Sequence, residues 1–100
     1  MPLRRTAPPT WAIDRRRLLG IRIAEARRAA ALSQEQLGDL VGVERRTIQR
    51  YEAGNRDPRY TDLLLIARAL GAPLAELVRE EERPPLRREE QGPPSGPPAP

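Results

Sequence analysis

The sequence contains no cysteine and no histidine, and only 3% of its 100 residues are aromatic. Without cysteine the chain can form neither a disulfide nor a thiolate nucleophile, and without both residues it lacks the usual zinc ligands. The absence of histidine also removes the commonest general base. We therefore expect no metal, no cofactor and no enzymatic activity. The densest acidic cluster, Glu80 to Glu82, is interpreted as a solvated helix end rather than an acid–base pair.

Long hydrophobic runs are also missing. The longest is Leu63 to Ala67, whereas a membrane-spanning helix needs ~20 apolar residues. Arg4 and Arg5 are not followed by the apolar segment that is typical of a secretory signal. We therefore expect a cytoplasmic protein without a membrane partner.

Lysine is absent as well, so all 18 basic residues are arginines, against 14 acidic residues and a net charge of +4. The sequence pI of about 10.9 favours an anionic partner. Two explanations account equally well for the exclusive use of arginine: codon usage in a GC-rich genome, and selection for phosphate binding. The charge alone therefore does not identify the partner.

The stretch from Gln34 to Tyr51 carries the clearest pattern in the chain. Its apolar residues predict two short amphipathic helices joined by a tight turn at Gly42, which is a helix-turn-helix. These apolar residues are Leu37, Val41, Val43, Ile48 and Tyr51. The opposite face of the second helix carries Arg45, Arg46, Gln49 and Arg50. An exposed helix rich in hydrogen-bond donors fits the major groove of DNA.

Periodicity and capping residues predict an all-α fold, a compact domain of five helices. Asp14 is the expected N-cap of the first helix, Ser33 with Gln36 forms a capping-box pattern, and Thr61 is the expected cap of the fourth. The predicted spans are about 15–31, 34–42, 45–53, 61–71 and 73–82, with glycines ending several of them. The fifth helix is expected to bury Leu74, Leu77 and Val78.

The chain divides into three segments. Residues 1–14 are predicted to be a flexible basic arm, 15–82 the DNA-binding domain and 83–100 a disordered Pro-rich tail. Trp11 and Ile13 are the exception within the arm. We expect them to pack on the domain rather than to remain exposed for a partner.

From Leu19 to Val78 the chain resembles the Cro and phage-repressor type of helix-turn-helix, also called the xenobiotic response element family, of bacterial and phage transcription regulators. The motifs are LSQEQL at 32–37, GV at 42–43, TIQRYEAG at 47–54, Pro58, and LLLIARALG at 63–71. Two residues depart from the family's pattern. Gly38 stands where alanine is usual, and Glu44 occupies the cap position where serine or threonine is usual.

The resemblance implies a sequence-specific regulator that reads double-stranded DNA with residues 45–53. The implied base contacts are Arg45, Arg46, Thr47 and Arg50, and the implied phosphate contacts are Gln34, Asn55, Arg56 and Arg59. Arginine can bond guanine through both O6 and N7, and Gln34 would add a helix N-terminus to the phosphate contacts.

A buried ion pair is expected between Arg27 and Glu52. Arg27 follows the apolar face at Ile23 and Ala26, and Glu52 lies four residues after Ile48. A related pair occurs in the family.

Two questions stay open at this stage. The fifth helix is a candidate dimer surface, and the alternative is a monomer until DNA brings two copies together. A regulator is favoured over an antitoxin whose DNA binding is autoregulatory and whose tail binds a protein partner.

Overall fold

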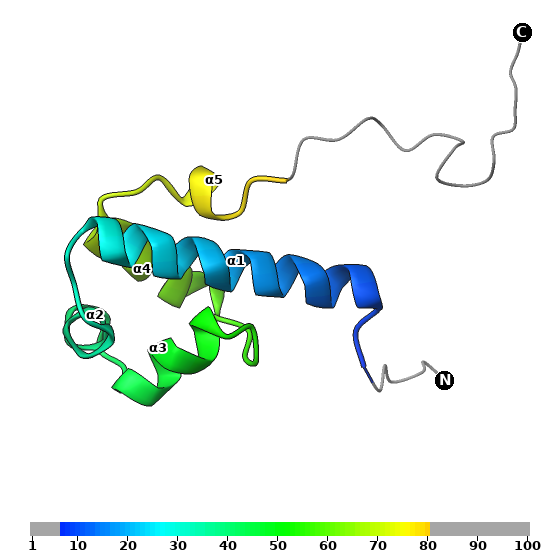
Figure 1. Cartoon of the computed structure of the whole chain (residues 1–100), viewed down its shortest axis with the longest axis horizontal. Coiled ribbons are helices and arrows are strands. Elements are labelled where there is room, and N and C mark those ends of the chain that lie inside the picture. The colour runs from blue at the N-terminus through cyan, green and yellow to red at the C-terminus, as the bar shows by residue number, and fades with distance from the viewer. Residues whose placement is uncertain (1–6, 81–100) are drawn as a thin grey trace, which may run out of the picture.

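In the computed structural model, residues 7–80 are described, and within that range the chain forms five helices and no strand (Figure 1). The all-α fold with five helices is therefore confirmed for this part of the chain. The helices are α1 (Thr10–Ala29), α2 (Gln34–Val41), α3 (Arg45–Glu52), α4 (Tyr60–Leu70) and α5 (Leu74–Leu77). The arm predicted before residue 7 and the tail predicted after residue 82 lie outside the described residues.

The long helix α1 organises the arrangement of the others. In Figure 1, α2 and α3 lie below α1, α4 lies behind it and α5 lies above it. One isoleucine or leucine from each of the first four helices is completely buried: Ile23, Leu37, Ile48 and Ile66. Burial of each such side chain contributes ~1.5–3 kcal/mol relative to exposure. The core is thus aliphatic, as expected for a chain without phenylalanine.

The ends of α2 agree with the sequence prediction. The Ser33 hydroxyl accepts a hydrogen bond from the backbone N–H of Gln36 at 2.9 Å, and the Gln36 side-chain oxygen accepts one from the Ser33 N–H at 2.8 Å. This is the capping box. Gly42 ends α2 with a φ of 92°, a left-handed conformation that glycine adopts without a Cβ clash.

The predicted start of α1 at Arg15 is wrong, because the helix begins at Thr10 with Pro9 rather than Asp14 as its N-cap. The Pro9 carbonyl accepts hydrogen bonds from the N–H groups of Ala12 and Ile13. Residues 10–14, assigned to the arm from the sequence, therefore belong to α1. This first turn extends past α3 and α4 (Figure 1), and a turn with little to pack against carries no apolar period.

Trp11 does not pack on the domain as expected. Its side chain lies on this extending turn and is 69% exposed, whereas Ile13 is partly buried. An indole that stays in water at a helix end is a large apolar surface without an intramolecular cover among the described residues.

The later helix boundaries differ from the predictions in smaller ways. Helix α3 ends at Glu52, and α4 begins at Tyr60 with Arg59, not Thr61, as its N-cap. Helix α5 is a single turn that ends at Leu77, although the sequence predicts a helix to about Glu82. Leu77 is buried in the core and Leu74 packs against it, but Val78 is 41% exposed.

Side chains of α1 explain the early end of α5. Arg22 donates to the carbonyl oxygens of Leu77 and Arg79, and Arg15 donates to that of Val78 at 3.4 Å. These carbonyls would accept from backbone N–H groups in a longer helix. The sequence pattern of α5 could not reveal that donors from α1 replace them.

Candidate DNA-binding surface

The turn between α2 and α3 is held by backbone contacts that leave no room for a side chain at Gly38. The Gly38 carbonyl accepts hydrogen bonds from the N–H groups of Gly42 and Val43. A Cβ atom on Gly38 would lie 2.6 Å from the Val43 carbonyl oxygen, closer than such atoms approach. Glycine in place of the family's usual alanine therefore lets α2 approach the start of α3 more closely.

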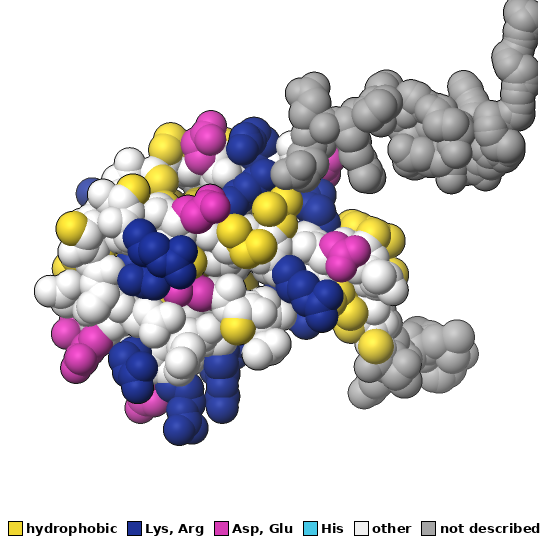
Figure 2. Space-filling view, viewed as in Figure 1, with side chains coloured by type: hydrophobic (Ala, Val, Ile, Leu, Met, Phe, Trp, Pro, Cys, Tyr) yellow, Lys and Arg dark blue, Asp and Glu magenta, His cyan; other side chains and the backbone are white. Residues whose placement is uncertain are grey.

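Helix α3 has one buried face and one exposed face. Ile48 and Tyr51 are buried in the core, whereas Arg45, Arg46 and Arg50 are exposed and Thr47 is partly exposed. Figure 2 shows basic side chains projecting from the edge of the molecule where α3 lies in Figure 1. The sequence-predicted base contacts thus share one helix and an accessible surface.

The exposed arginines of α3 have no protein partner within residues 7–80. Neither Arg45, Arg46 nor Arg50 makes a side-chain hydrogen bond or an ion pair there. Glu44, the N-cap of α3, also makes no side-chain capping bond and is exposed. The guanidinium groups are therefore free to donate to another molecule, and each offers five N–H donors.

The loop after α3 carries further basic residues close to the C-terminal end of that helix. Gly54 ends the helix with a φ of 75°, and the exposed residues Asn55, Arg56 and Arg59 follow it. The charges of Arg56 and Arg59 both act to lower the pKa of Tyr51, so both lie near the end of α3. The loop is held by Arg16 of α1, whose Nε donates to the Gly54 carbonyl oxygen at 2.8 Å.

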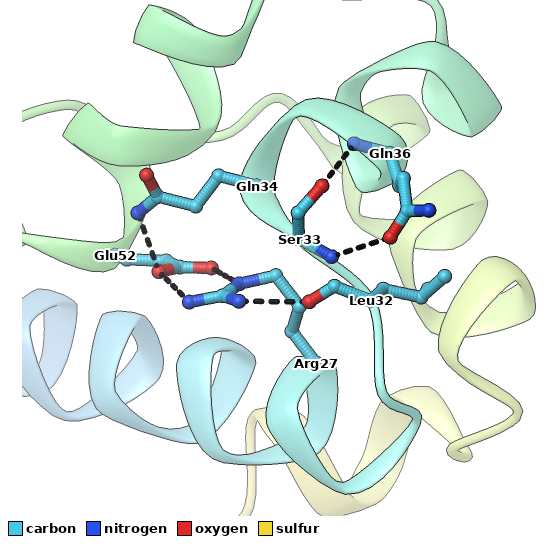
Figure 3. Close-up of polar contacts among 6 residues, drawn as sticks. All are labelled: Arg27, Leu32, Ser33, Gln34, Gln36 and Glu52. Carbon is cyan, nitrogen blue, oxygen red and sulfur yellow. Dashed lines mark hydrogen bonds and ion pairs between the residues drawn. The ribbon is translucent and has the colours of Figure 1, made fainter.

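The predicted ion pair between Arg27 and Glu52 is present (Figure 3). Arg27 Nε and Nη2 donate to the two carboxylate oxygens of Glu52 at 2.7 and 3.1 Å. The side chains are only 11% and 7% exposed. Arg27 Nη1 also donates to the Leu32 carbonyl oxygen at 2.8 Å. The hydrogen bond from Glu52 raises the pKa of Arg27 above its already high ordinary value, so the guanidinium stays charged.

Gln34 connects this ion pair to the start of α2. Its side-chain amide donates to Glu52 Oε1 at 3.0 Å, so Glu52 receives donors from α1 and α2 while it belongs to α3 (Figure 3). The sequence singled out Gln34 only as a phosphate contact. An amide nitrogen carries two hydrogens, so this contact to Glu52 leaves one donor available.

Tyr51 ties the same C-terminal end of α3 to α4. Its hydroxyl donates to Asp62 Oδ2 at 3.0 Å. Burial raises the pKa of the Tyr51 hydroxyl, and the hydrogen bond to Asp62 raises it further. Helix α3 is therefore anchored to α1, α2 and α4 by polar contacts on its inner side while its outer face stays unoccupied.

Two residues that position this surface were not found from the sequence. One is Arg16, whose contact with Gly54 joins residues 38 positions apart. The other is Gly20, where a Cβ atom would lie 2.5 Å from the carbonyl oxygens of both Tyr51 and Glu52. A glycine inside a helix is a usable signal of close approach, whereas nothing in the local sequence of Arg16 indicates its partner.

Neither a metal site nor a membrane span is found among the described residues. They contain no cluster of three or more potential metal ligands. None of the helices in residues 7–80 is long and apolar enough to cross a membrane. Glu80, from the acidic cluster, pairs with Arg15 at 3.2 Å.

The turn, the basic outer face of α3 and its anchored inner face define a helix-turn-helix DNA-binding domain. Residues 18–80 match the family described as a helix-turn-helix domain. The chain therefore belongs to the helix-turn-helix family of DNA-binding transcriptional regulators, as the sequence motifs predict.

Relatives and solved structures of the same kind agree. The chain is 33% identical over 74 residues to the uncharacterized HTH-type transcriptional regulator y4dJ of Sinorhizobium fredii, covering 74% of this chain and 96% of that protein. It is 33% identical over 61 residues to the cryptic phage CTXphi transcriptional repressor RstR of Vibrio cholerae, covering 61% and 55% of the two chains.

Two crystal structures share the fold. The restriction-modification controller protein C.AhdI from Aeromonas hydrophila is 34% identical with a TM-score of 0.63, over 65% of this chain and 94% of that one. The P22 c2 repressor, crystallised with a synthetic operator, is 31% identical with a TM-score of 0.60, over 62% of this chain and 94% of that one. This chain is accordingly a sequence-specific DNA-binding regulator of transcription.

Proposed function

We propose that the chain regulates transcription by inserting α3 into the major groove of an operator. Arg45, Arg46, Thr47 and Arg50 contact base edges in this arrangement. The observation that carries the proposal is that the three arginines of α3 are exposed and unpaired within residues 7–80, while polar contacts anchor the C-terminal end of α3 to the helices behind it. An arginine aimed by a rigid helix can bond guanine through two atoms.

The surrounding phosphate contacts come from both ends of the helix pair. Asn55, Arg56 and Arg59 bind the backbone from the loop after α3. Gln34 binds it from the start of α2, where the helix N-terminus and the second amide hydrogen of the side chain both favour an anion. Because Gln34 also donates to Glu52, the ion pair sets the direction of this phosphate contact.

The two groups of arginines are expected to respond differently to substitution. The operator is first obtained by selecting bound sites from random DNA with the purified protein. Alanine at Arg45, Arg46 or Arg50 should then cost ~1–3 kcal/mol on the operator and relax the preference at one base pair. Alanine at Arg56 or Arg59 should weaken operator and scrambled duplex equally, and should lower the slope of log affinity against log salt by about one.

Arg68 provides the matched control. It is exposed on α4 and has no side-chain partner within the described residues, so Arg68→Ala removes the same charge away from the proposed surface. It should change the affinity for the operator far less than the other five variants. Equal loss on both duplexes for all five would mean that α3 only grips the backbone, and the assignment of its base contacts would be wrong.

The proposal includes a cytoplasmic location and no enzymatic activity. A homodimer and a protein partner for the C-terminal segment remain separate proposals. Helix α5 itself offers a second copy little apolar surface, because Leu77 is 2% exposed and Leu74 packs against the core, whereas Val78 at its C-terminal cap is 41% exposed. Sedimentation with and without operator duplex distinguishes a stable dimer from two monomers on one site, and copurification tests for a bound protein, as the antitoxin alternative requires.

A further inference from the structure

A groove beside the N-terminal half of α1 takes no part in the proposed DNA contacts. One end of it is lined by Pro8, Pro9, Trp11, Ala12, Arg16 and Asp57. A continuation lined by the same last three residues reaches Leu77 and Val78. The groove therefore extends from the first turn of α1 to the point where the chain leaves α5.

The chemistry of the open end suits a proline-rich segment. Trp11 is 69% exposed and stands beside two prolines, so its indole presents an apolar face to solvent. In space-filling view, hydrophobic side chains reach the surface around this end of α1 (Figure 2). Extended proline-rich segments dock in grooves lined by aromatic residues, because their conformation is already ordered before binding.

The chain leaves the domain beside this groove. Arg15 forms an ion pair with Glu80 at 3.2 Å and donates to the Val78 carbonyl oxygen. Arg15 lies one turn after Trp11 on α1, a distance of ~6 Å along the helix. The chain after Glu80 therefore starts beside the continuation of the groove, which Arg15, Leu77 and Val78 line.

We propose that Pro84, Pro85 and Leu86 of this same chain occupy the groove and cover Trp11. They follow Glu80 by four to six residues, and an extended segment spans ~3.1 Å per residue, so Pro84 can reach ~12 Å from the Glu80 anchor. From there the segment follows the groove, whose two parts share Ala12, Arg16 and Asp57, toward Trp11. The segment occupies the groove within a single molecule.

The charges that follow these residues fit the same position. Arg87 and Arg88 come directly after Leu86 in the sequence. The Asp57 carboxylate lines the groove, is 76% exposed and is 3.9 Å from Arg16, its ion-pair partner. It can therefore accept hydrogen bonds from a second guanidinium group.

The single tryptophan of the chain makes the proposal directly measurable. The probe is Trp11 emission in the full chain, comparing wild type with Pro84→Ser/Pro85→Ser/Leu86→Ser. The variant should shift the emission to the red and increase quenching by acrylamide, because the indole loses its cover. Pro93→Ser/Pro94→Ser, farther along the chain, is the matched control and should leave both quantities unchanged. Circular dichroism checks that the helices are retained.

Four results would overturn the proposal. One is identical emission and quenching in the wild type and the triple variant. Another is a dependence of the wild-type spectrum on protein concentration, which assigns the groove to a second copy. A red shift in Leu3→Ser but not in the triple variant assigns it to the N-terminal segment. A blue shift that needs duplex DNA assigns it to nucleic acid.

Discussion

Most arginines of α1 and all three of α3 are used in opposite ways, although the side chains are chemically identical. Every arginine of α1 from Arg15 to Arg27 has a partner in the protein, whether a carboxylate, a backbone carbonyl or both. The three arginines of α3 have none within residues 7–80. The number of arginines therefore says little about DNA binding, whereas their partners say much.

The difference follows from what each helix crosses. Helix α1 passes the ends of α3 and α5, where backbone carbonyls lack a helical partner and need donors from elsewhere. Arg16 supplies one at Gly54, and Arg22 supplies one at Leu77. Helix α3 buries Ile48, Tyr51 and the side chain of Glu52 and faces solvent on its other side. Its arginines are left for a ligand because no helix crosses that face.

The largest expected effect is on stability, at the buried ion pair that Arg27 of α1 forms with Glu52. Glu52→Ala leaves the buried Arg27 guanidinium without its carboxylate and should lower the free energy of unfolding by ~3–5 kcal/mol. Urea unfolding followed by circular dichroism measures it. The control is Asp14→Ala, which removes an ion pair with Arg17 whose side chains are 64% and 65% exposed and should cost under ~1 kcal/mol. Equal losses in the two variants would show that burial of the first pair contributes nothing.

A second pair of variants tests the comparison directly. Arg16→Ala should lower the free energy of unfolding by ~1.5–3 kcal/mol, since it removes a charged donor from the Gly54 carbonyl oxygen. Arg50→Ala should leave it within ~0.5 kcal/mol of wild type and instead lower operator affinity. Unfolding and binding are measured on the same preparations. A large loss of stability in Arg50→Ala would show that Arg50 stabilises the fold, as the partnered arginines of α1 do.

The spacing between α1 and α3 gives a third test. Gly20→Ala adds a Cβ atom where the carbonyl oxygens of Tyr51 and Glu52 leave no room. Alanine favours a helix by ~1 kcal/mol over glycine. We expect overpacking, which typically costs ~1–3 kcal/mol, to exceed this gain, so the melting temperature should fall. Glu25→Ala, at an exposed position of α1, is the control. A rise in melting temperature in Gly20→Ala would contradict the close packing.

The smallest effect concerns the bond from Tyr51 to Asp62. Because burial raises the pKa of Tyr51 above its ordinary value of 10.0, the unfolded chain loses this proton first as pH rises. The contribution of the protonated Tyr51 hydroxyl to the free energy of unfolding is complete below about pH 10. It is lost as pH rises through the pKa of the folded state, at up to ~1.4 kcal/mol per pH unit. No lysine or cysteine titrates in this range.

Urea unfolding measures this dependence of stability on pH. It is carried out between about pH 9 and pH 12, in steps of about one unit. Tyr51→Phe should remove it and lower stability at neutral pH by ~1 kcal/mol. Tyr60→Phe is the control, because Tyr60 is 66% exposed. If Tyr51→Phe keeps the alkaline loss of stability seen in the wild type, the hydroxyl is not its source.

The sequence alone determined the elements whose signals are local. The capping box at Ser33, the left-handed glycine at Gly42 and the apolar spacing of α2 and α3 depend on residues within one or two turns. The pairing of Arg27 with Glu52 was also predictable, because both residues lie next to positions on buried helical faces and the family supplies a related pair.

The tertiary structure decided where α1 begins, where α5 ends and which arginines are free. The first turn of α1 has no apolar period because it extends beyond the core, and α5 stops where Arg15 and Arg22 take its carbonyls. The arginine partners lie 25, 38, 55 and 63 residues away along the chain. An arginine on a helix surface has the same sequence pattern whether another helix packs over it or it faces water. Only the packing of the helices therefore separates the two cases.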